Sequence, residues 1–174
     1  SNIENIYKLR QHPYFTALID IARLSGSAIL DFYKKQDVGI SYKKDESPLT
    51  KADLKSDEII TNELLSISDL PVVSEESKST NTKSGTYWLV DPLDGTKEFL
   101  NKNDEFTVNI ALIENGFPSL GIVYVPVTSI IYIGGANLGS AKIESSNNIS
   151  VINVCSPCDT ITVSYTHLTL PTIY

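Results

Sequence analysis

The chain has 174 residues, 41% of them hydrophobic, which is enough to bury the core of one domain or slightly more. Its 21 acidic and 14 basic residues give a formal charge of -7, which excludes a basic surface for nucleic-acid polymers; a phosphorylated substrate would need metal ions to offset that charge. No apolar run approaches the roughly 20 residues that span a bilayer, and no basic-then-apolar signal pattern opens the sequence. We therefore expect a cytoplasmic protein without a transmembrane segment.

Two amphipathic helices are expected in the first part of the chain. Apolar residues recur at mostly three-to-four spacing from Tyr14 to Lys35, as on one face of a helix. A polar stretch containing Pro48 follows, and Thr50 is predicted to be an N-cap, with Asp53 three positions later. The second helix then runs to about Ser66.

Strand-like patterns follow the helices. Short apolar runs occupy 71–76 and 86–91, and 106–114 is a longer strand candidate. Asn115 and Gly116 predict a turn, after which two strands are separated by Pro126. Two helices followed by mostly antiparallel strands predict an α+β layered domain rather than alternating βαβ units.

Cysteine and histidine offer little for catalysis. Cys155 and Cys158 form a single C-x-x-C motif without a second pair for a zinc site, so reduced thiols without a redox or metal role are expected. His12 and His167 lie near opposite ends of the chain. Acid or base chemistry is therefore expected from carboxylates and hydroxyls.

The string DPLDGT, residues 91–96, is the main candidate site. Asp91 follows the apolar run, and Asp94 can turn back beside it to share a cation; a backbone carbonyl such as that of Leu93 can serve as a further oxygen ligand. Gly95 lets a ligand approach the backbone closely, and Thr96 begins a short helix whose free N–H groups favour phosphate. Magnesium and phosphate sites would therefore be adjacent.

Three further acidic residues stand at the ends of predicted elements. Glu75 and Glu76 follow a short strand, and Asp53 lies in the first turn of the second helix. Each feature has a purely structural alternative: Asp91 and Asp94 as turn formers, the two glutamates as a solvated loop, and Asp53 as an ordinary first-turn carboxylate.

Read together, SPLTKAD, VVSEES, WLVDPLDGTKEF and FTVNIALIENGFPSLGIVYVPV resemble the inositol monophosphatase superfamily, from about the first helix to about Gly139. D-P-L-D-G-T is the metal motif of that superfamily. Lys97 and Glu98 before Phe99 resemble its CysQ-type branch, the 3'(2'),5'-bisphosphate nucleotidases. The resemblance implies a layered αβαβα sugar-phosphatase-like fold, represented here mainly by the two helices and the antiparallel sheet.

The resemblance also implies roles for individual residues. Metal-ligand roles, for two or more Mg²⁺ ions, fall on Glu75, Asp91, the carbonyl of Leu93, and Asp94. Asp53 and Thr96 resemble the catalytic pair that activates the attacking water. Substrate-binding roles fall on Glu75, Leu93, Asp94, Gly95 and Thr96.

The implied substrate is a small phosphorylated nucleotide. Removal of the 3'-phosphate from adenosine 3',5'-bisphosphate would give AMP and phosphate, and a sulfated relative of that nucleotide could also react. Such enzymes recycle a by-product of sulfate assimilation and are typically sensitive to lithium, and some family members associate peripherally with the inner membrane. An inositol or sugar monophosphatase and a catalytically incomplete cation-binding fragment remain as alternatives, and the oligomeric state is left open.

The sequence departs from the family pattern towards its C-terminal end. Family members carry a further aspartate in a W-D-x-A-A-type helix start, which is missing here, since the single tryptophan is Trp88. The run VSYTHLTLPT resembles translated sequencing-adaptor sequence, with a divergent native strand as the alternative. We therefore expect 1–163 to be an N-terminal metal-binding phosphatase domain with a truncated family fold, and 164–174 to be a non-native tail.

Overall fold

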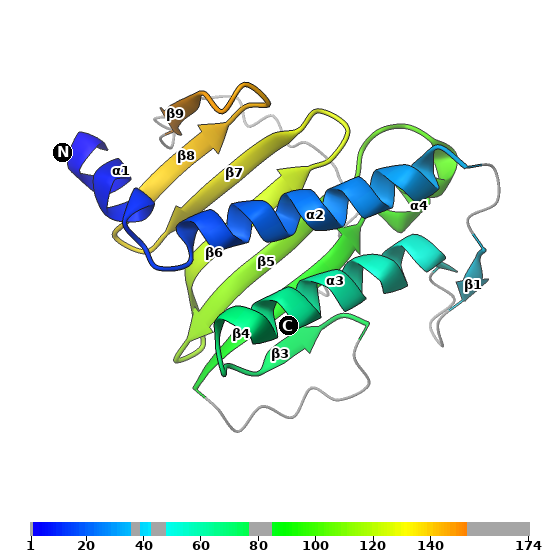
Figure 1. Cartoon of the computed structure of the whole chain (residues 1–174), viewed down its shortest axis with the longest axis horizontal. Helices are drawn as coiled ribbons and strands as arrows, with labels where there is room; N and C mark the ends of the chain where they lie inside the picture. Colours follow the sequence, from blue (N-terminus) through cyan, green and yellow to red (C-terminus); the bar gives the residue numbers. More distant parts are fainter. Residues whose placement is uncertain (1, 36–38, 43–47, 77–84, 153–174) are drawn as a thin grey trace, which may run out of the picture.

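The computed structural model describes residues 2–35, 39–42, 48–76 and 85–152, and it places helices on one face of a seven-stranded sheet (Figure 1). Helices α2 (Phe15–Tyr33) and α3 (Lys51–Ile67) pack against each other across this face. The shorter α1 (Asn2–Arg10) contacts the far edge of the sheet. The two predicted helices are confirmed to within about two residues at each end.

The sheet follows chain order from one edge to the other. The first pair of strands is parallel and all later pairs are antiparallel, which confirms the α+β class. The strands are β3 (Val72–Ser74), β4 (Thr86–Asp94), β5 (Thr107–Glu114), β6 (Phe117–Val125), β7 (Ile130–Gly135), β8 (Gly139–Ile143) and β9 (Ile149–Ile152). A separate ribbon pairs β1 (Ser41–Tyr42) with β2 (Pro48–Leu49), and α4 (Thr96–Asn101) follows β4 directly.

The core lies between the helices and the sheet. Period-2 alternation in β4 turns Trp88 and Val90 inward, where both are buried, and leaves Leu89 44% exposed on the other face. Phe99 of α4 packs edge to face on Phe106, with ring centroids 5.3 Å apart, and Tyr33 of α2 contacts both rings. These aromatic contacts fix α4, and therefore the segment before it, to the end of α2.

The predicted turn at Asn115 and Gly116 is confirmed. Both residues have positive φ, 52° and 83°, as a two-residue type I′ hairpin requires, and the turn joins β5 to β6. Pro126 ends the pairing of β6, as expected, because β6 stops at Val125 and β7 starts at Ile130.

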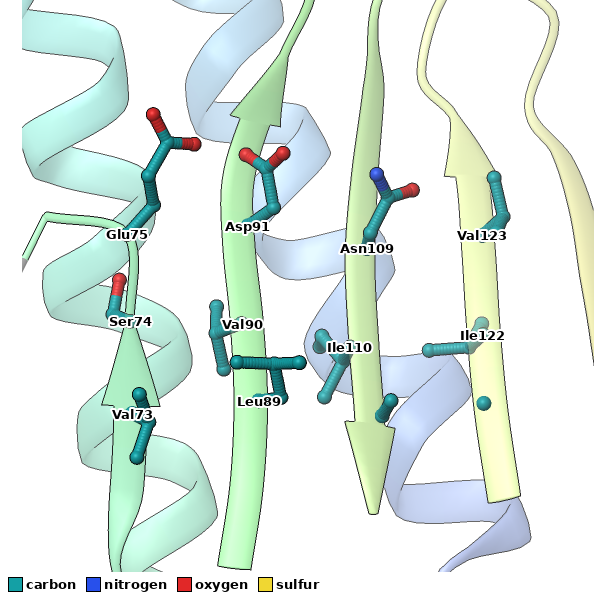
Figure 2. Close-up of a pocket in the computed structure, with 12 residues that line it drawn as sticks. Val73, Ser74, Glu75, Leu89, Val90, Asp91, Asn109, Ile110, Ile122 and Val123 are labelled. Carbon is teal, nitrogen blue, oxygen red and sulfur yellow. The ribbon is translucent and has the colours of Figure 1, made fainter. Parts of the chain in front are cut away.

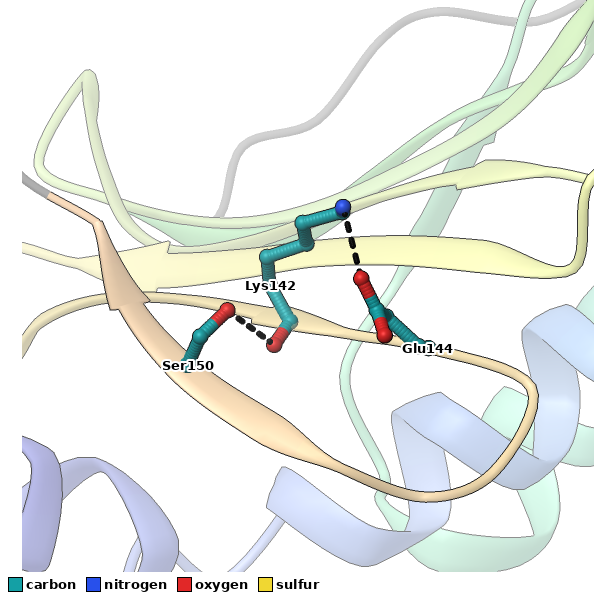
Figure 3. Close-up of polar contacts among 3 residues, drawn as sticks. All are labelled: Lys142, Glu144 and Ser150. Atoms are coloured by element: carbon teal, nitrogen blue, oxygen red, sulfur yellow. Dashed lines mark hydrogen bonds and ion pairs between the residues drawn. The ribbon is translucent and has the colours of Figure 1, made fainter.

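Strands β8 and β9 form the far edge of the sheet. Lys142 pairs with Glu144 at 2.9 Å, and the Ser150 hydroxyl donates to the Lys142 carbonyl across the hairpin (Figure 3). The four side chains of β9 are exposed, and exposed ion pairs of this kind contribute little to stability. The sequence pattern had not indicated this hairpin.

Candidate active site

The predicted acidic residues gather where β3 and β4 end. In the β4–β5 ladder Asp91 faces Asn109 and Asp94 faces Thr107, and the register shifts between these two pairs. The shift is a bulge, which turns the end of β4 out of the regular ladder. It therefore brings Asp91 and Asp94 to the same end of the strand.

Glu75 lies beside Asp91. Its backbone N–H donates to the Val90 carbonyl at 3.0 Å, which continues the parallel pairing of β3 with β4 beyond Ser74. Figure 2 shows the Glu75 and Asp91 side chains at the ends of their strands, with Asn109 on the next strand. They stand at one end of a pocket of about 570 Å³ on the sheet face opposite to α2 and α3, whose floor is mostly apolar.

Asp91 has an unusual electrostatic environment. Burial, followed by the negative charges of Glu75 and Asp94 and a hydrogen bond shared with Glu75, raises the pKa of Asp91 from 3.8 to about 8. Within the part of the chain that the structure describes, Asp91 Oδ1 is one of two buried side-chain oxygens without a hydrogen-bond partner, the other being Oδ1 of Asp57. Such an oxygen needs either a proton or a cation nearby.

Asp53 is buried, 1% exposed, in the first turn of α3. Thr50 and Asp53 form a capping box: the Thr50 N–H donates to Asp53 Oδ2 at 2.9 Å, and the Thr50 hydroxyl donates to the same oxygen at 2.5 Å. The other oxygen, Oδ1, accepts from the Thr96 hydroxyl at 3.0 Å. Burial raises the pKa of Asp53, and the hydrogen bonds from Thr50 and Thr96 oppose that shift.

Gly95 and Thr96 form the start of α4. Gly95 has φ +87°, and a Cβ there would lie 2.8 Å from the Glu105 carbonyl oxygen, so both the backbone conformation and the space require glycine. Besides its bond to Asp53, the Thr96 hydroxyl lies 3.3 Å from the Leu93 carbonyl oxygen. The structure thus brings Asp53 and Thr96 together, as predicted, although they are 43 positions apart.

The site offers the type of donor atom that a divalent cation prefers, but its side chains do not form a complete set of ligands. Across residues 2–35, 39–42, 48–76 and 85–152, no three His, Cys, Asp or Glu side chains converge as a ready-made metal site. The unpartnered Asp91 oxygen and the neighbouring carboxylates Glu75 and Asp94 are the hard oxygen donors that Mg²⁺ prefers. The ligand assignment, and the substrate-binding assignment of Leu93, Gly95 and their neighbours, stay predictions.

Asn109 is a site residue that the sequence analysis missed. Its Nδ2 donates to Asp94 Oδ2 at 3.3 Å, and its Oδ1 accepts from the Thr107 hydroxyl at 3.1 Å. A signal was available, because strand alternation places Asn109 on the face opposite to the buried Val108 and Ile110.

The remaining sequence predictions fall elsewhere. His12 lies near Glu114, at the end of β5 remote from Asn109, and burial lowers the pKa of His12. Cys155, Cys158 and His167, with the predicted tail, are outside the described residues. Among the helices in the described ranges, none is both long and apolar enough to cross a membrane.

The chain is similar in sequence to known phosphatases. Residues 10–169 match the Inositol monophosphatase family, a span that runs into the predicted tail. The chain is 40% identical over 161 residues to the 3'(2'),5'-bisphosphate nucleotidase CysQ of Buchnera aphidicola, covering 88% of this chain and 60% of that protein. It is 46% identical over 117 residues to CysQ of Salmonella typhimurium, covering 64% and 48%. The chain thus spans about half to three-fifths of the length of these relatives.

Solved structures show the same fold. Bacteroides thetaiotaomicron CysQ, described as a bacterial member of the inositol monophosphatase family, superposes with a TM-score of 0.65 at 42% identity, covering 75% of this chain and 48% of that one. The extragenic suppressor protein suhB of Bartonella henselae superposes with a TM-score of 0.68 at 28% identity, covering 74% and 51%.

Proposed function

Because the chain belongs to the inositol monophosphatase family, we propose that it is the part of a magnesium-dependent 3'(2'),5'-bisphosphate nucleotidase that carries the water-activating pair. The proposed reaction converts adenosine 3',5'-bisphosphate and water to AMP and phosphate. The names of the relatives support the substrate class. The observation that carries the chemistry is the hydrogen bond from Thr96 to the buried Asp53.

This hydrogen bond sets up a proton relay. The single hydroxyl proton of Thr96 points to Asp53 Oδ1, so the lone pairs of Thr96 Oγ1 are free to accept a proton from an attacking water. As the water oxygen bonds to phosphorus and the bond to the 3'-oxygen breaks, a proton passes from water to Thr96 and from Thr96 to Asp53. The released 3'-oxygen takes up a proton from solvent to give the 3'-hydroxyl of AMP. General-base help of this kind contributes roughly 10²–10⁴-fold to rate.

The environment of Asp53 suits a base. Burial raises its pKa above the ordinary value, and an aspartate with a raised pKa holds a transferred proton better than a solvent-exposed one. The opposing hydrogen bonds from Thr50 and Thr96 favour the ionised form, which the relay needs at its start.

Glu75, Asp91, the Leu93 carbonyl and Asp94 would hold the metal ions. Bound there, Mg²⁺ would offset the phosphate charge and lower the pKa of the attacking water. The carboxylates crowd negative charge around Asp91, and a cation would relieve that repulsion. Backbone N–H groups at Gly95 and Thr96 would face the phosphate, next to the metal ligands.

A catalytically incomplete cation-binding fragment is the second candidate, because the chain spans only about half of the matched relatives. An inositol or sugar monophosphatase is a third, supported by the name of the Inositol monophosphatase family that residues 10–169 match.

One assay separates the three candidates. Phosphate release from adenosine 3',5'-bisphosphate and from inositol 1-phosphate is measured for this chain with Mg²⁺, with and without lithium, and with Asp94→Asn as the inactive control. We expect lithium-sensitive release from the nucleotide that the substitution abolishes. Faster release from the inositol ester would favour the monophosphatase, and Mg²⁺ binding without release from either ester would favour the fragment.

A further inference from the structure

Two buried serines link the helices to the segment that carries the site. Ser25 of α2 and Ser56 of α3 are both fully buried, and their hydroxyl oxygens lie 2.6 Å apart. The Ser56 hydroxyl also lies 2.6 Å from the Pro92 carbonyl oxygen, to which it donates. Pro92 stands between the two predicted metal ligands Asp91 and Asp94.

The direction of this chain of hydrogen bonds follows from the number of protons. Ser56 has one hydroxyl proton, and the Pro92 carbonyl can only accept, so that proton lies on the Ser56–Pro92 bond. The Ser25 hydroxyl must therefore be the donor to Ser56. The serine hydrogen bonds therefore run from Ser25 to Ser56 and from Ser56 to Pro92.

The serine hydrogen bonds end at a point in the sheet where a backbone carbonyl has no regular partner on the neighbouring strand. The β4–β5 register shifts between Asp91 and Asp94, so Pro92 and Leu93 stand in the bulge. The Pro92 carbonyl accepts from a hydroxyl instead, that of Ser56 at 2.6 Å, whereas the Thr96 proton is committed to Asp53 and leaves the Leu93 carbonyl for the proposed cation. Buried carbonyl groups need such replacements.

Helix α3 thus holds the segment at two points. Ser56 and Asp53 are three positions apart and lie on one face of the helix. Ser56 holds Pro92 at the start of the segment, and Asp53 holds Thr96 at its end. The Leu93 carbonyl, Asp94 and Gly95 lie between the two attachments.

We propose that Ser56, supported by Ser25, is a positioning residue that fixes the bulge of β4 so that Asp91, the Leu93 carbonyl and Asp94 face one cation. The functional part of this inference rests on the proposed function. Ser56 touches neither substrate nor metal and acts only through the Pro92 carbonyl.

The test compares Ser56→Ala with Ser66→Ala in the full chain. Ser66 is the matched control because it lies on the same helix, is exposed, and its hydroxyl donates to the Glu63 carbonyl of that helix. Hydrogen exchange, read by mass spectrometry, is compared between 91–99 and the reference segment 120–133. We expect Ser56→Ala to speed exchange in 91–99 about tenfold more than in 120–133, the effect of losing one buried hydrogen bond. Ser66→Ala should change neither segment selectively.

Ser25→Ala tests the direction of the serine hydrogen bonds and remains informative if Ser56→Ala fails to fold. It leaves the Ser56–Pro92 bond intact, so it should produce a selective effect in 91–99 that is smaller, about threefold. Equal acceleration in both segments for the serine variants would overturn the positioning role. A larger selective effect for Ser25→Ala than for Ser56→Ala would overturn the direction.

Magnesium affinity measures the functional consequence. By calorimetry with Mg²⁺ alone, we expect Ser56→Ala to raise the dissociation constant about three- to tenfold and Ser66→Ala to leave it unchanged. Unchanged affinity in Ser56→Ala would overturn the inference even if the segment loosens. If the unmodified chain binds no Mg²⁺, the proposed function fails, and the exchange comparison alone decides whether Ser56 fixes the bulge.

Discussion

Asp91 should make the stability of the metal-free chain fall as the pH rises. The pKa of Asp91 is about 8 in the folded chain, against 3.8 ordinarily, because of burial and the charges of Glu75 and Asp94. The folded state therefore binds this proton more tightly than the unfolded state. Its contribution to stability is full below about pH 4, declines as the pH rises, and is lost above about pH 8.

The size of this loss of stability follows from the raised pKa of Asp91. Between about pH 5 and pH 8 the decline spans roughly three pH units, which at about 1.4 kcal/mol per unit gives an upper bound of about 4 kcal/mol. Asp91 is only partly buried at its pocket end, where solvent and counterions screen the repulsion, so we expect about 1–3 kcal/mol.

Urea unfolding in the presence of a chelator measures this decline at several pH values. Asp91→Asn should reduce the decline in the free energy of unfolding with pH by about 1–3 kcal/mol. Asp20→Asn, at an exposed position of α2, should show the same pH dependence as the unmodified chain. Saturating Mg²⁺ at about pH 8 should restore most of the lost stability, because a cation replaces the proton. If Asp91→Asn and the unmodified chain show the same pH dependence, the electrostatic reasoning about Asp91 is wrong.

Three further changes have expected outcomes. Thr96→Val should lower phosphate release by about 100-fold or more and destabilise the chain by about 1–3 kcal/mol, because the buried Asp53 loses a hydrogen bond, whereas Thr96→Ser should retain most of the rate and the stability; equal rates for both variants would rule out the hydroxyl relay. Gly95→Ala should destabilise the chain by about 1–3 kcal/mol in urea unfolding because of its positive φ and the nearby Glu105 carbonyl, and Gly116→Ala, with positive φ in open space, should cost less. Phe99→Ala should cost about 3–5 kcal/mol, since the ring is fully buried in the aromatic cluster, and a loss below about 1 kcal/mol would contradict that packing.

The sequence predicted the elements whose signals are local. The three-to-four spacing of α2, the Thr50 cap of α3, and the turn at Asn115 and Gly116 each depend on residues within a few positions of one another. The β8–β9 hairpin was missed because its strands are short and β9 is exposed on both faces, so it lacks the alternation that marks a half-buried strand.

The site residues likewise fall into those that local sequence signals indicate and those that only the folded structure reveals. Motif spacing and family resemblance pointed to Asp53, Asp91 and Thr96, and the structure brings Asp53 within hydrogen-bond distance of Thr96. Strand alternation indicated the face of the sheet on which Asn109 lies, but the hydrogen-bond partners of Asn109 and Ser56 could not be identified from neighbouring residues in the sequence. Their importance arises from a strand register and a helix crossing, which bring together residues 15 and 36 positions apart.

The structural and functional interpretations of Asp53 are not alternatives. The capping box occupies Oδ2, which accepts both the N–H and the hydroxyl of Thr50. Oδ1 is therefore the oxygen left to receive a proton, and it faces Thr96. The cap thus fixes the orientation of the carboxylate, and in the proposed mechanism it selects which of the two oxygens acts as the base. Because the start of α3 is buried against the end of β4, one carboxylate can cap the helix with Oδ2 and, in the proposed mechanism, accept the proton with Oδ1.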